Sequence, residues 1–157
     1  MELKTDIFDL FDSRWALLTA GTAEDFNNMT ISWGGLGTLW SKPVATIYIR
    51  TVRHTHKYLD SNEYFTLSFF PAQYRKTLAM LGSKSGRDID KMHMEGLTPK
   101  AVGETVGYEE AELTLVCRRL FRQQIDPTKV PVRIAENFYD GDYPHDMYIG
   151  EVVEILS

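Results

Sequence analysis

Three short stretches of the chain combine hydroxyl, amide and basic side chains in ways that suit ligand binding. The first, NMTISWGGLGTLWSKP at residues 28–43, has one charged residue, three glycines and five hydroxyl or amide side chains. The second is RTVRHT at residues 50–55, and the third is GSKSGRDIDK at residues 82–91. Neutral donors suit a flat aromatic ligand with a polar edge, and basic groups suit a phosphate. Together the stretches predict an uncharged aromatic ligand that carries a phosphate.

The first stretch is interpreted as a strand followed by glycines. In a strand over residues 29–33, Met29, Ile31 and Trp33 would face the core, whereas Thr30 and Ser32 would present hydroxyls on the other face. The glycines that follow would let a ligand or another backbone approach closely. They do not form a dinucleotide-binding fingerprint, because they lead into another strand and not into a helix. The alternative is a glycine-rich barrel corner whose hydroxyls face solvent.

The second and third stretches each precede an expected helix. Free backbone N–H groups and the helix dipole at such a start favour an anion. Arg50 ends a strand, Arg53, His54 and Thr55 begin the first helix, and Asp88 begins the other. Neither stretch has the spacing of a nucleotide-binding P-loop. The alternative for both is a solvated loop that caps a helix.

Most apolar segments are short, rich in β-branched and aromatic residues, and bounded by Gly, Pro, Asn or Asp, which predicts strands. We expect strands at 15–21, 29–33, 44–50, 64–70, 111–124 and 147–155. Helices are expected in HTHKYLDSN after Arg53, in PAQYRKTLAMLG after Phe70, and, shorter, after Asp88. The chain is therefore predicted to be mainly β, a closed or split β-barrel with a few inserted α-helices.

Length and composition indicate a single domain over residues 1–157 with ordinary globular composition. Seventeen basic and 22 acidic residues give a net charge of -5, which makes nucleic acid an unexpected partner. The apolar runs are too short to span a bilayer, and the N-terminus resembles neither a signal nor a transit peptide. The lone cysteine, Cys117, excludes an internal disulfide and suits a reducing compartment. A cytoplasmic location is expected.

Other chemistries find little support in the sequence. His54 and His56 form an H-x-H pair, but a metal site needs three or four convergent ligands, so no metal is predicted. There is no G-x-S-x-G motif for a serine hydrolase. Cys117 lies within an expected strand, away from the basic setting that a nucleophilic thiol needs, and is predicted to be a buried structural residue.

Several ordered motifs resemble one known family. They are M-T-x-S-W-G at 29–34, S-K-P at 41–43, I-R at 49–50, R-H-T at 53–55, F-T-L-S-F-F-P at 65–71 and K-S-G-R-D-x-D-K at 84–91. This succession, which covers roughly residues 10–155, resembles the flavin reductase-like family, the FMN-binding split barrels that include flavoredoxin. The resemblance implies a split-barrel homodimer that binds FMN non-covalently, with NAD(P)H or a redox protein as electron donor.

The resemblance also assigns expected roles to residues. Asn28, Met29, Thr30, Ile31 and Ser32 would line the isoalloxazine edge through main-chain N–H groups. Arg50, Arg53, His54 and Thr55 would hold the phosphate. Lys84, Ser85, Gly86 and Arg87 would approach the flavin from the helical insertion or grip the nucleotide substrate. Trp33 would either pack against the flavin ring or fill the barrel.

The element YPHDMYIGEV at 143–152 resembles the G-D-H-x-x-x-x-G element of flavin reductases, in which the histidine lies beside the nicotinamide. His145 is therefore the candidate catalytic residue, although Tyr143 and Pro144 replace the Gly-Asp pair and leave a structural role open. The expected activity is an FMN-dependent oxidoreductase. The alternatives are a non-catalytic FMN electron carrier and a split barrel that binds heme or another small ligand.

Overall fold

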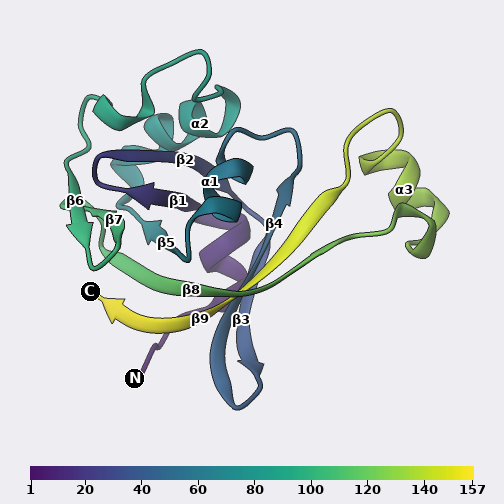
Figure 1. Cartoon of the computed structure of the whole chain (residues 1–157), viewed down its shortest axis with the longest axis horizontal. Coiled ribbons are helices and arrows are strands. Elements are labelled where there is room, and N and C mark those ends of the chain that lie inside the picture. Colours follow the sequence, from purple (N-terminus) through teal and green to yellow (C-terminus); the bar gives the residue numbers. More distant parts are fainter.

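A seven-stranded antiparallel sheet forms the body of the protein (Figure 1). The computed structural model describes all 157 residues. The strand order is β2-β1-β5-β8-β9-β4-β3. The strands are β1 (Ala16–Thr22), β2 (Asp25–Ile31), β3 (Gly34–Leu39), β4 (Lys42–Arg50), β5 (Tyr64–Phe69), β8 (Leu113–Gln124) and β9 (His145–Leu156). A separate hairpin pairs β6 (Pro99–Val102) with β7 (Thr105–Tyr108).

The sheet curves around one main apolar core. The register between β8 and β9 shifts at Val116/Cys117 and at Arg119/Phe121, and such irregularities bend a strand and increase its twist. The core collects buried side chains from the N-terminal segment and from β1, β2, β4, β5, β8 and β9. Cys117 belongs to this core with no exposed surface, and burial raises the pKa of its thiol, so the predicted structural role is confirmed. The expected mainly β, split-barrel architecture is confirmed as well.

Three α-helices and four single turns complete the chain. The helices are α1 (Thr55–Ser61), α2 (Arg75–Ser83) and α3 (Val132–Phe138). The turns are a π-helix at Asp9–Ser13 and 3-10 helices at Ala72–Tyr74, Lys91–His93 and Pro127–Lys129. The first two expected helices are confirmed, whereas the third is only the three-residue turn at Lys91–His93. No helix reaches the length and apolar character needed to cross a membrane.

The helix α3 was not predicted, and its position is unusual. The chain leaves the sheet at the end of β8, forms α3 away from the body of the molecule, and returns along β9 (Figure 1). Val132 and Ile134 remain exposed on it.

All six expected strands are present, with shifted ends for the strand expected at 29–33. Met29 and Ile31 are buried as predicted, but β2 ends at Ile31. The placement of Trp33 on the core face is therefore wrong, and its side chain is 45% exposed. The glycine-rich segment that follows is itself a strand, β3, joined to β4 by Trp40 and Ser41 with φ angles of 52° and 59°. Such a two-residue turn with both φ angles positive matches the twist of the strands it connects.

Candidate functional site

The strand β2 lies at an edge of the sheet, because it pairs only with β1. Its other side is covered by α2 and by the segment that follows α2. The Thr30 hydroxyl donates a hydrogen bond to the Leu78 carbonyl, and Lys91 Nζ donates to the Asn28 carbonyl at 2.9 Å. The polar main chain of this edge is thus met by groups from α2 and residues 84–91, not by another strand.

A shallow cavity of about 350 Å³ opens between β2 and α2. Its lining residues are Trp15, Thr30, Ser32, Leu78, Ala79, Gly82 and Ser83. Thr30 and Ser32 are the two hydroxyl residues that the alternation along the strand predicted to face away from the core. Both are partly exposed, so this part of the predicted site is open to a ligand.

Four basic side chains gather beside this cavity, and we call Arg53, His54, Arg87 and Lys91 the basic cluster. Arg53 donates to the Gly82 carbonyl at 3.2 Å, and Arg87 donates to the Val52 carbonyl at 3.2 Å. None of the four forms a salt bridge in the structure, whereas Arg14, Arg50, Arg118 and Arg122 each do. The cluster therefore holds positive charge without a contacting carboxylate.

The electrostatics of the basic cluster show how crowded these cations are. Burial lowers the pKa of His54, and the charges of Lys57, Arg87 and Lys91 lower it further. Burial, together with the charge of Arg53, lowers the pKa of Lys91 to about 8. Burial is the largest cause of both pKa shifts, and repulsion from neighbouring cations adds to it. An anion placed among these groups would relieve the repulsion.

Close packing brings together two of the stretches predicted to bind a ligand, residues 50–55 and residues 82–91. Asn27 Nδ2 donates to the Thr55 hydroxyl at 2.8 Å, and Thr55 is almost completely buried. A Cβ atom on Gly86 would lie 2.1 Å from Asn27 Oδ1 and 2.9 Å from His54 Cδ2. Only glycine at position 86 therefore lets the loop close on β2 and on the start of α1.

Several predicted residues contribute no side chain to the cavity. Asn28, Met29 and Ile31 point into the interior, where Asn28 Nδ2 donates to the Tyr108 hydroxyl at 2.8 Å. These three positions can offer only main-chain groups, as the resemblance implied. Lys84 is exposed, and the Ser85 hydroxyl accepts a hydrogen bond from the Arg87 N–H at 3.1 Å.

The remaining predicted residues lie in a second region, the arm junction, which we define as Trp33, Arg50, Phe138, Tyr139 and His145. The Arg50 guanidinium donates to the carbonyls of Tyr143 and Phe138 and lies 3.6 Å from the Asp142 carboxylate. Arg50 is thus engaged with the α3 arm and not with the basic cluster. Trp33 meets the Phe138 ring edge-on at a centroid distance of 5.4 Å.

His145 is buried in the arm junction, with 6% of its surface exposed. Its Nδ1 lies 2.9 Å from the Tyr139 hydroxyl, and its ring lies 5.6 Å from Trp33. Burial lowers the pKa of His145 to about 4, assisted by the charge of Arg50. The candidate catalytic histidine is therefore a neutral group that already has a partner.

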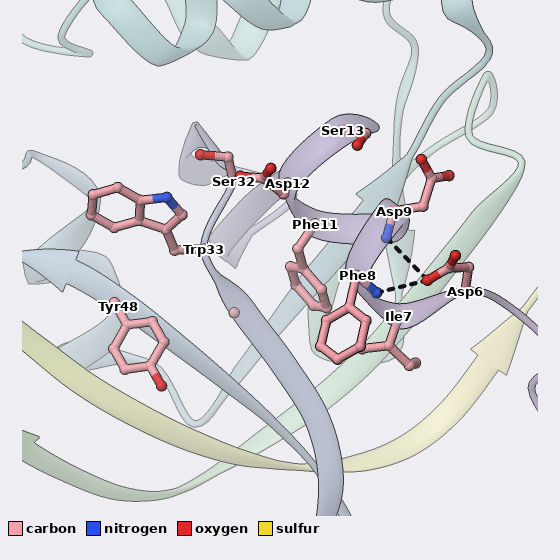
Figure 2. Close-up of a pocket in the computed structure, with 11 residues that line it drawn as sticks. Asp6, Ile7, Phe8, Asp9, Phe11, Asp12, Ser13, Ser32, Trp33 and Tyr48 are labelled. Carbon is pink, nitrogen blue, oxygen red and sulfur yellow. Dashed lines mark hydrogen bonds between the residues drawn. The ribbon is translucent and has the colours of Figure 1, made fainter.

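A larger cavity, of about 690 Å³, lies next to Ser32 and Trp33 (Figure 2). Its other walls come from the N-terminal segment and from Tyr48 on β4. In that segment, Asp6 Oδ1 accepts hydrogen bonds from the N–H groups of Phe8 and Asp9, which fixes the turn. Ser32 lines both cavities and marks the place where they adjoin.

A polar network ties α1 to the long strands β8 and β9. His56 Nε2 lies 2.6 Å from Asp146 Oδ2, while Asp60 accepts from the Tyr148 hydroxyl and from Arg122, each at 2.8 Å. This network holds α1 in place, and with it Arg53 and His54, the two residues of the basic cluster that precede α1. No group of three or more His, Cys, Asp and Glu side chains is placed to hold a metal ion.

Comparison with known proteins bears on this arrangement of edge strand, cavity and basic cluster. The family model described as a flavin reductase like domain matches residues 8–156. The chain belongs to the flavin reductase-like family. The predicted resemblance is thereby confirmed. A search of curated proteins finds no significant match.

Solved structures of this family share the fold. An FMN-binding protein from Thermus thermophilus is 20% identical, with a TM-score of 0.71, over 100% of this chain and 80% of its own. Flavoredoxin from Methanosarcina acetivorans is 17% identical, with a TM-score of 0.71, over 100% and 74% of the two chains. The styrene monooxygenase flavin reductase from Pseudomonas putida S12 is 17% identical, with a TM-score of 0.66, over 91% and 78%. At these identities the likeness establishes the fold.

The sequence interpretation of this flavin reductase-like chain missed two residues of the site. Asn27 lies two positions before the strand expected at 29–33, although its amide reaches Thr55. Lys91 is the last residue of the K-S-G-R-D-x-D-K motif, but it was not assigned to the site because a lysine next to a predicted loop is ordinarily solvent-exposed. Its place as the last charged position of a family motif was the available signal.

Proposed function

We propose that this protein binds FMN non-covalently and acts as an FMN-dependent oxidoreductase, passing electrons between NAD(P)H or a redox protein and the flavin. The observation that carries the proposal is the basic cluster. Four basic side chains without a salt bridge lie beside a cavity lined by Thr30, Ser32 and Gly82. A phosphate on an uncharged aromatic ligand matches that division into charged and neutral parts.

An unpaired polar atom supports the fit to FMN. Five buried side-chain nitrogen or oxygen atoms in the chain lack a hydrogen-bond partner, and one of them, His54 Nδ1, belongs to the basic cluster. Buried polar atoms without partners are rare in folded proteins and commonly mark a place where a ligand or water completes the bonding. His54 Nδ1 can donate to an anion, which the surrounding cations would also attract.

In this proposal the protein binds and orients the cofactor. Arg53 and Arg87 hold the phosphate, with His54 Nδ1 as a further donor, and the main chain at Thr30 and Ser32, where the cavity opens, offers polar groups to the ring. Thr30 and Ser32 supply neutral hydroxyls, which can stabilise developing negative charge without a fixed ion pair. When bound, FMN supplies the hydride or electron transfer itself.

The phosphate part of the proposal is tested by comparing FMN with riboflavin, which has the same ring but no phosphate. We expect a titration followed by flavin fluorescence to give FMN an affinity at least about 100-fold higher, because two or more charge-assisted hydrogen bonds distinguish the ligands. Equal affinities for the two flavins would refute the assignment of the basic cluster to phosphate. Binding of neither flavin would refute the proposed cofactor.

Electron transfer from a nicotinamide is tested separately. Anaerobic addition of NADH or NADPH to the FMN-loaded protein should bleach the flavin absorption bands if the oxidoreductase proposal is right. A second candidate, a non-catalytic FMN electron carrier, is favoured by the burial of His145 and its bond to Tyr139. The carrier would leave the bands unchanged with either nucleotide and lose them with a reducing redox protein.

We also propose that the protein acts in the cytoplasm as a homodimer of single-domain subunits. Exposed apolar side chains on α3, led by Val132 at 72% exposure, continue toward exposed Phe138 and Trp33. A second copy covering these groups would remove an apolar surface from water. Light scattering should give a mass near twice the 18.0 kDa of the chain. A monomeric mass at micromolar concentration would overturn the dimer.

A further inference from the structure

Lys91 is buried to an unusual degree for a lysine, with only 4% of its surface exposed. Lysine side chains are almost never fully buried unless their charge has partners. Here the partners are two main-chain carbonyls: Nζ donates to Asn28 on β2 at 2.9 Å and to Leu81 on α2 at 3.0 Å. The ammonium group therefore joins the edge strand of the sheet to the end of a helix.

Both partners adjoin the cavity that is proposed to receive the flavin. Asn28 lies two residues before Thr30, and Leu81 immediately precedes Gly82, and both Thr30 and Gly82 line that cavity. The last carbonyls of α2 carry the negative end of the helix dipole, which favours a cation there. Lys91 thus has a structural reason to be charged immediately behind the wall of the cavity.

We propose that Lys91 is a positioning residue that fixes the β2 edge against α2 and, in its charged form, places a positive charge beside the cavity wall, favouring reduced over oxidised flavin. This inference rests on the proposed FMN-binding function. Reduction adds negative charge to the flavin, and a buried cation interacts more strongly with such charge than a solvated one does. Arg53 and Arg87 are the groups proposed to hold the phosphate, whereas Lys91 bonds two carbonyls and no carboxylate, so no acidic side chain in contact cancels its charge.

The test replaces the ammonium group while keeping the length of the chain. In Lys91→Met, we expect a tenfold or larger loss in the stability of reduced relative to oxidised FMN, about 30 mV for a two-electron couple. The reduction potential is measured at pH 7 with saturating FMN. Lys91→Arg should restore most of the potential, and Lys76→Met, which removes an exposed charge from α2, should leave it unchanged. An unaltered potential in Lys91→Met would overturn the proposal.

Hydrogen exchange in the ligand-free protein tests the positioning part without any flavin. Lys91→Met should exchange its amides faster across residues 27–32 and not in the β6–β7 hairpin. Unchanged exchange at 27–32 would overturn the anchoring role. If the wild-type protein binds no FMN, the proposed function fails by itself, whereas this measurement still decides whether Lys91 anchors β2.

The wild-type protein offers a further measurement if Lys91→Met does not fold. The titratable and charged groups around Lys91 are Arg53, His54, Arg87 and, through Asn28, Tyr108. Of these, only Lys91 changes charge between pH 7 and 9, since its pKa is about 8, that of His54 is lowered from 6.5 and that of Tyr108 is raised to about 12. The potential should fall more steeply with pH once Lys91 begins to lose its proton. In Lys91→Arg, whose guanidinium keeps its charge, this steepening should be absent. Equal steepening in the wild type and Lys91→Arg would overturn the proposal.

Discussion

The basic cluster and the arm junction both contain residues that the family motifs marked as site residues, yet they differ in how their polar groups are satisfied. In the basic cluster, cations lack salt bridges and His54 Nδ1 has no partner. In the arm junction, Arg50 already holds two carbonyls and a carboxylate, and His145 is bonded to Tyr139. Charge that is left unpaired at a folding cost indicates ligand binding, whereas paired charge indicates structural support.

This difference separates residues that the sequence motifs placed in one group. Arg50 and Arg53 are three positions apart and were both expected to bind phosphate. Their side chains diverge because Arg50 is the last residue of β4, where it pairs with His145 in register, while Arg53 lies in the turn that begins α1. The experiments below test whether this divergence governs FMN binding.

The largest effect is expected from Arg53→Ala. Loss of the guanidinium removes charge-assisted hydrogen bonds to the phosphate, so the dissociation constant for FMN should rise by about 10- to 100-fold. Riboflavin affinity should change little, since riboflavin lacks the phosphate. Titration of both flavins therefore distinguishes a lost phosphate contact from damage to the end of α2, where Arg53 also bonds Gly82.

Arg133→Ala is the matched control for that experiment, because Arg133 is exposed on α3 and forms no salt bridge. Its affinity for FMN should equal that of the wild type. If Arg53→Ala weakened FMN and riboflavin equally, the basic cluster would act on the fold and not on the phosphate.

A smaller effect is expected from Gly86→Ala, which tests the closure of the loop. The new methyl group would lie far inside contact distance of Asn27 Oδ1, so the loop must move away from β2 and α1. Overpacking of this kind costs about 1–3 kcal/mol, and we expect at least tenfold weaker FMN binding with a lower free energy of unfolding. Urea denaturation and FMN titration measure the two effects.

Gly35→Ala provides the comparison for this change, since a methyl group there meets no atom within 4 Å. Gly35 lies on β3, away from the basic cluster, and the substitution should leave FMN affinity unchanged. Equal behaviour of the two variants would mean that position 86 has more room than the packing indicates.

The sequence predicted the main strands of the sheet better than β3, the β6–β7 hairpin and α3, and the reasons are physical. The six expected strands carry the alternation or apolar runs that burial in a sheet requires. The segment Gly34–Leu39 has three glycines and little alternation, and it is a strand because its main chain pairs with β4. The β6–β7 hairpin did carry a usable signal, since Gly103, with a φ of 56°, separates two short apolar segments.

The site was predicted only in part, because motifs give positions in the sequence and not the direction of side chains. They located the hydroxyls of Thr30 and Ser32 and the residues Arg53 to Thr55 and Lys84 to Arg87. They could not show that Arg50 and Arg53 belong to different regions. Side-chain direction at the end of a strand depends on what packs there, and α3 was not predicted. The burial of Lys91 likewise depends on the carbonyls of Asn28 and Leu81, which are distant in sequence.

The pH dependence of stability should reveal the neutral state of His145. Its pKa is about 4 in the folded protein and near 6.5 when unfolded. The folded state disfavours protonation of His145, so the protein is stabilised when this histidine is neutral. The stability is therefore fully present above pH 6.5, and part of it is lost progressively as the pH falls from 6.5 to 4. We expect a loss of about 1–2 kcal/mol in the free energy of unfolding between pH 7 and 5. Urea denaturation at both pH values measures it.

His145→Gln should flatten this dependence, because glutamine does not titrate. The remaining slope then reports the carboxylates and His54, which belong to other regions. If wild type and His145→Gln lost stability equally between pH 7 and 5, His145 would be protonated in the folded state and the arm junction would be more solvated than its burial indicates.

The smallest effect on binding is expected from Arg50→Ala, the counterpart of Arg53→Ala in the arm junction. Removing the guanidinium frees the carbonyls of Phe138 and Tyr143, so α3 should exchange its amide hydrogens faster. The dissociation constant for FMN should stay within about threefold of the wild-type value, a difference of under 1 kcal/mol. Hydrogen exchange and FMN titration on the same preparation measure both. A loss of FMN affinity as large as that of Arg53→Ala would mean that the two regions act on one ligand. The arm junction would then join the basic cluster in the phosphate site, as the family motifs had implied.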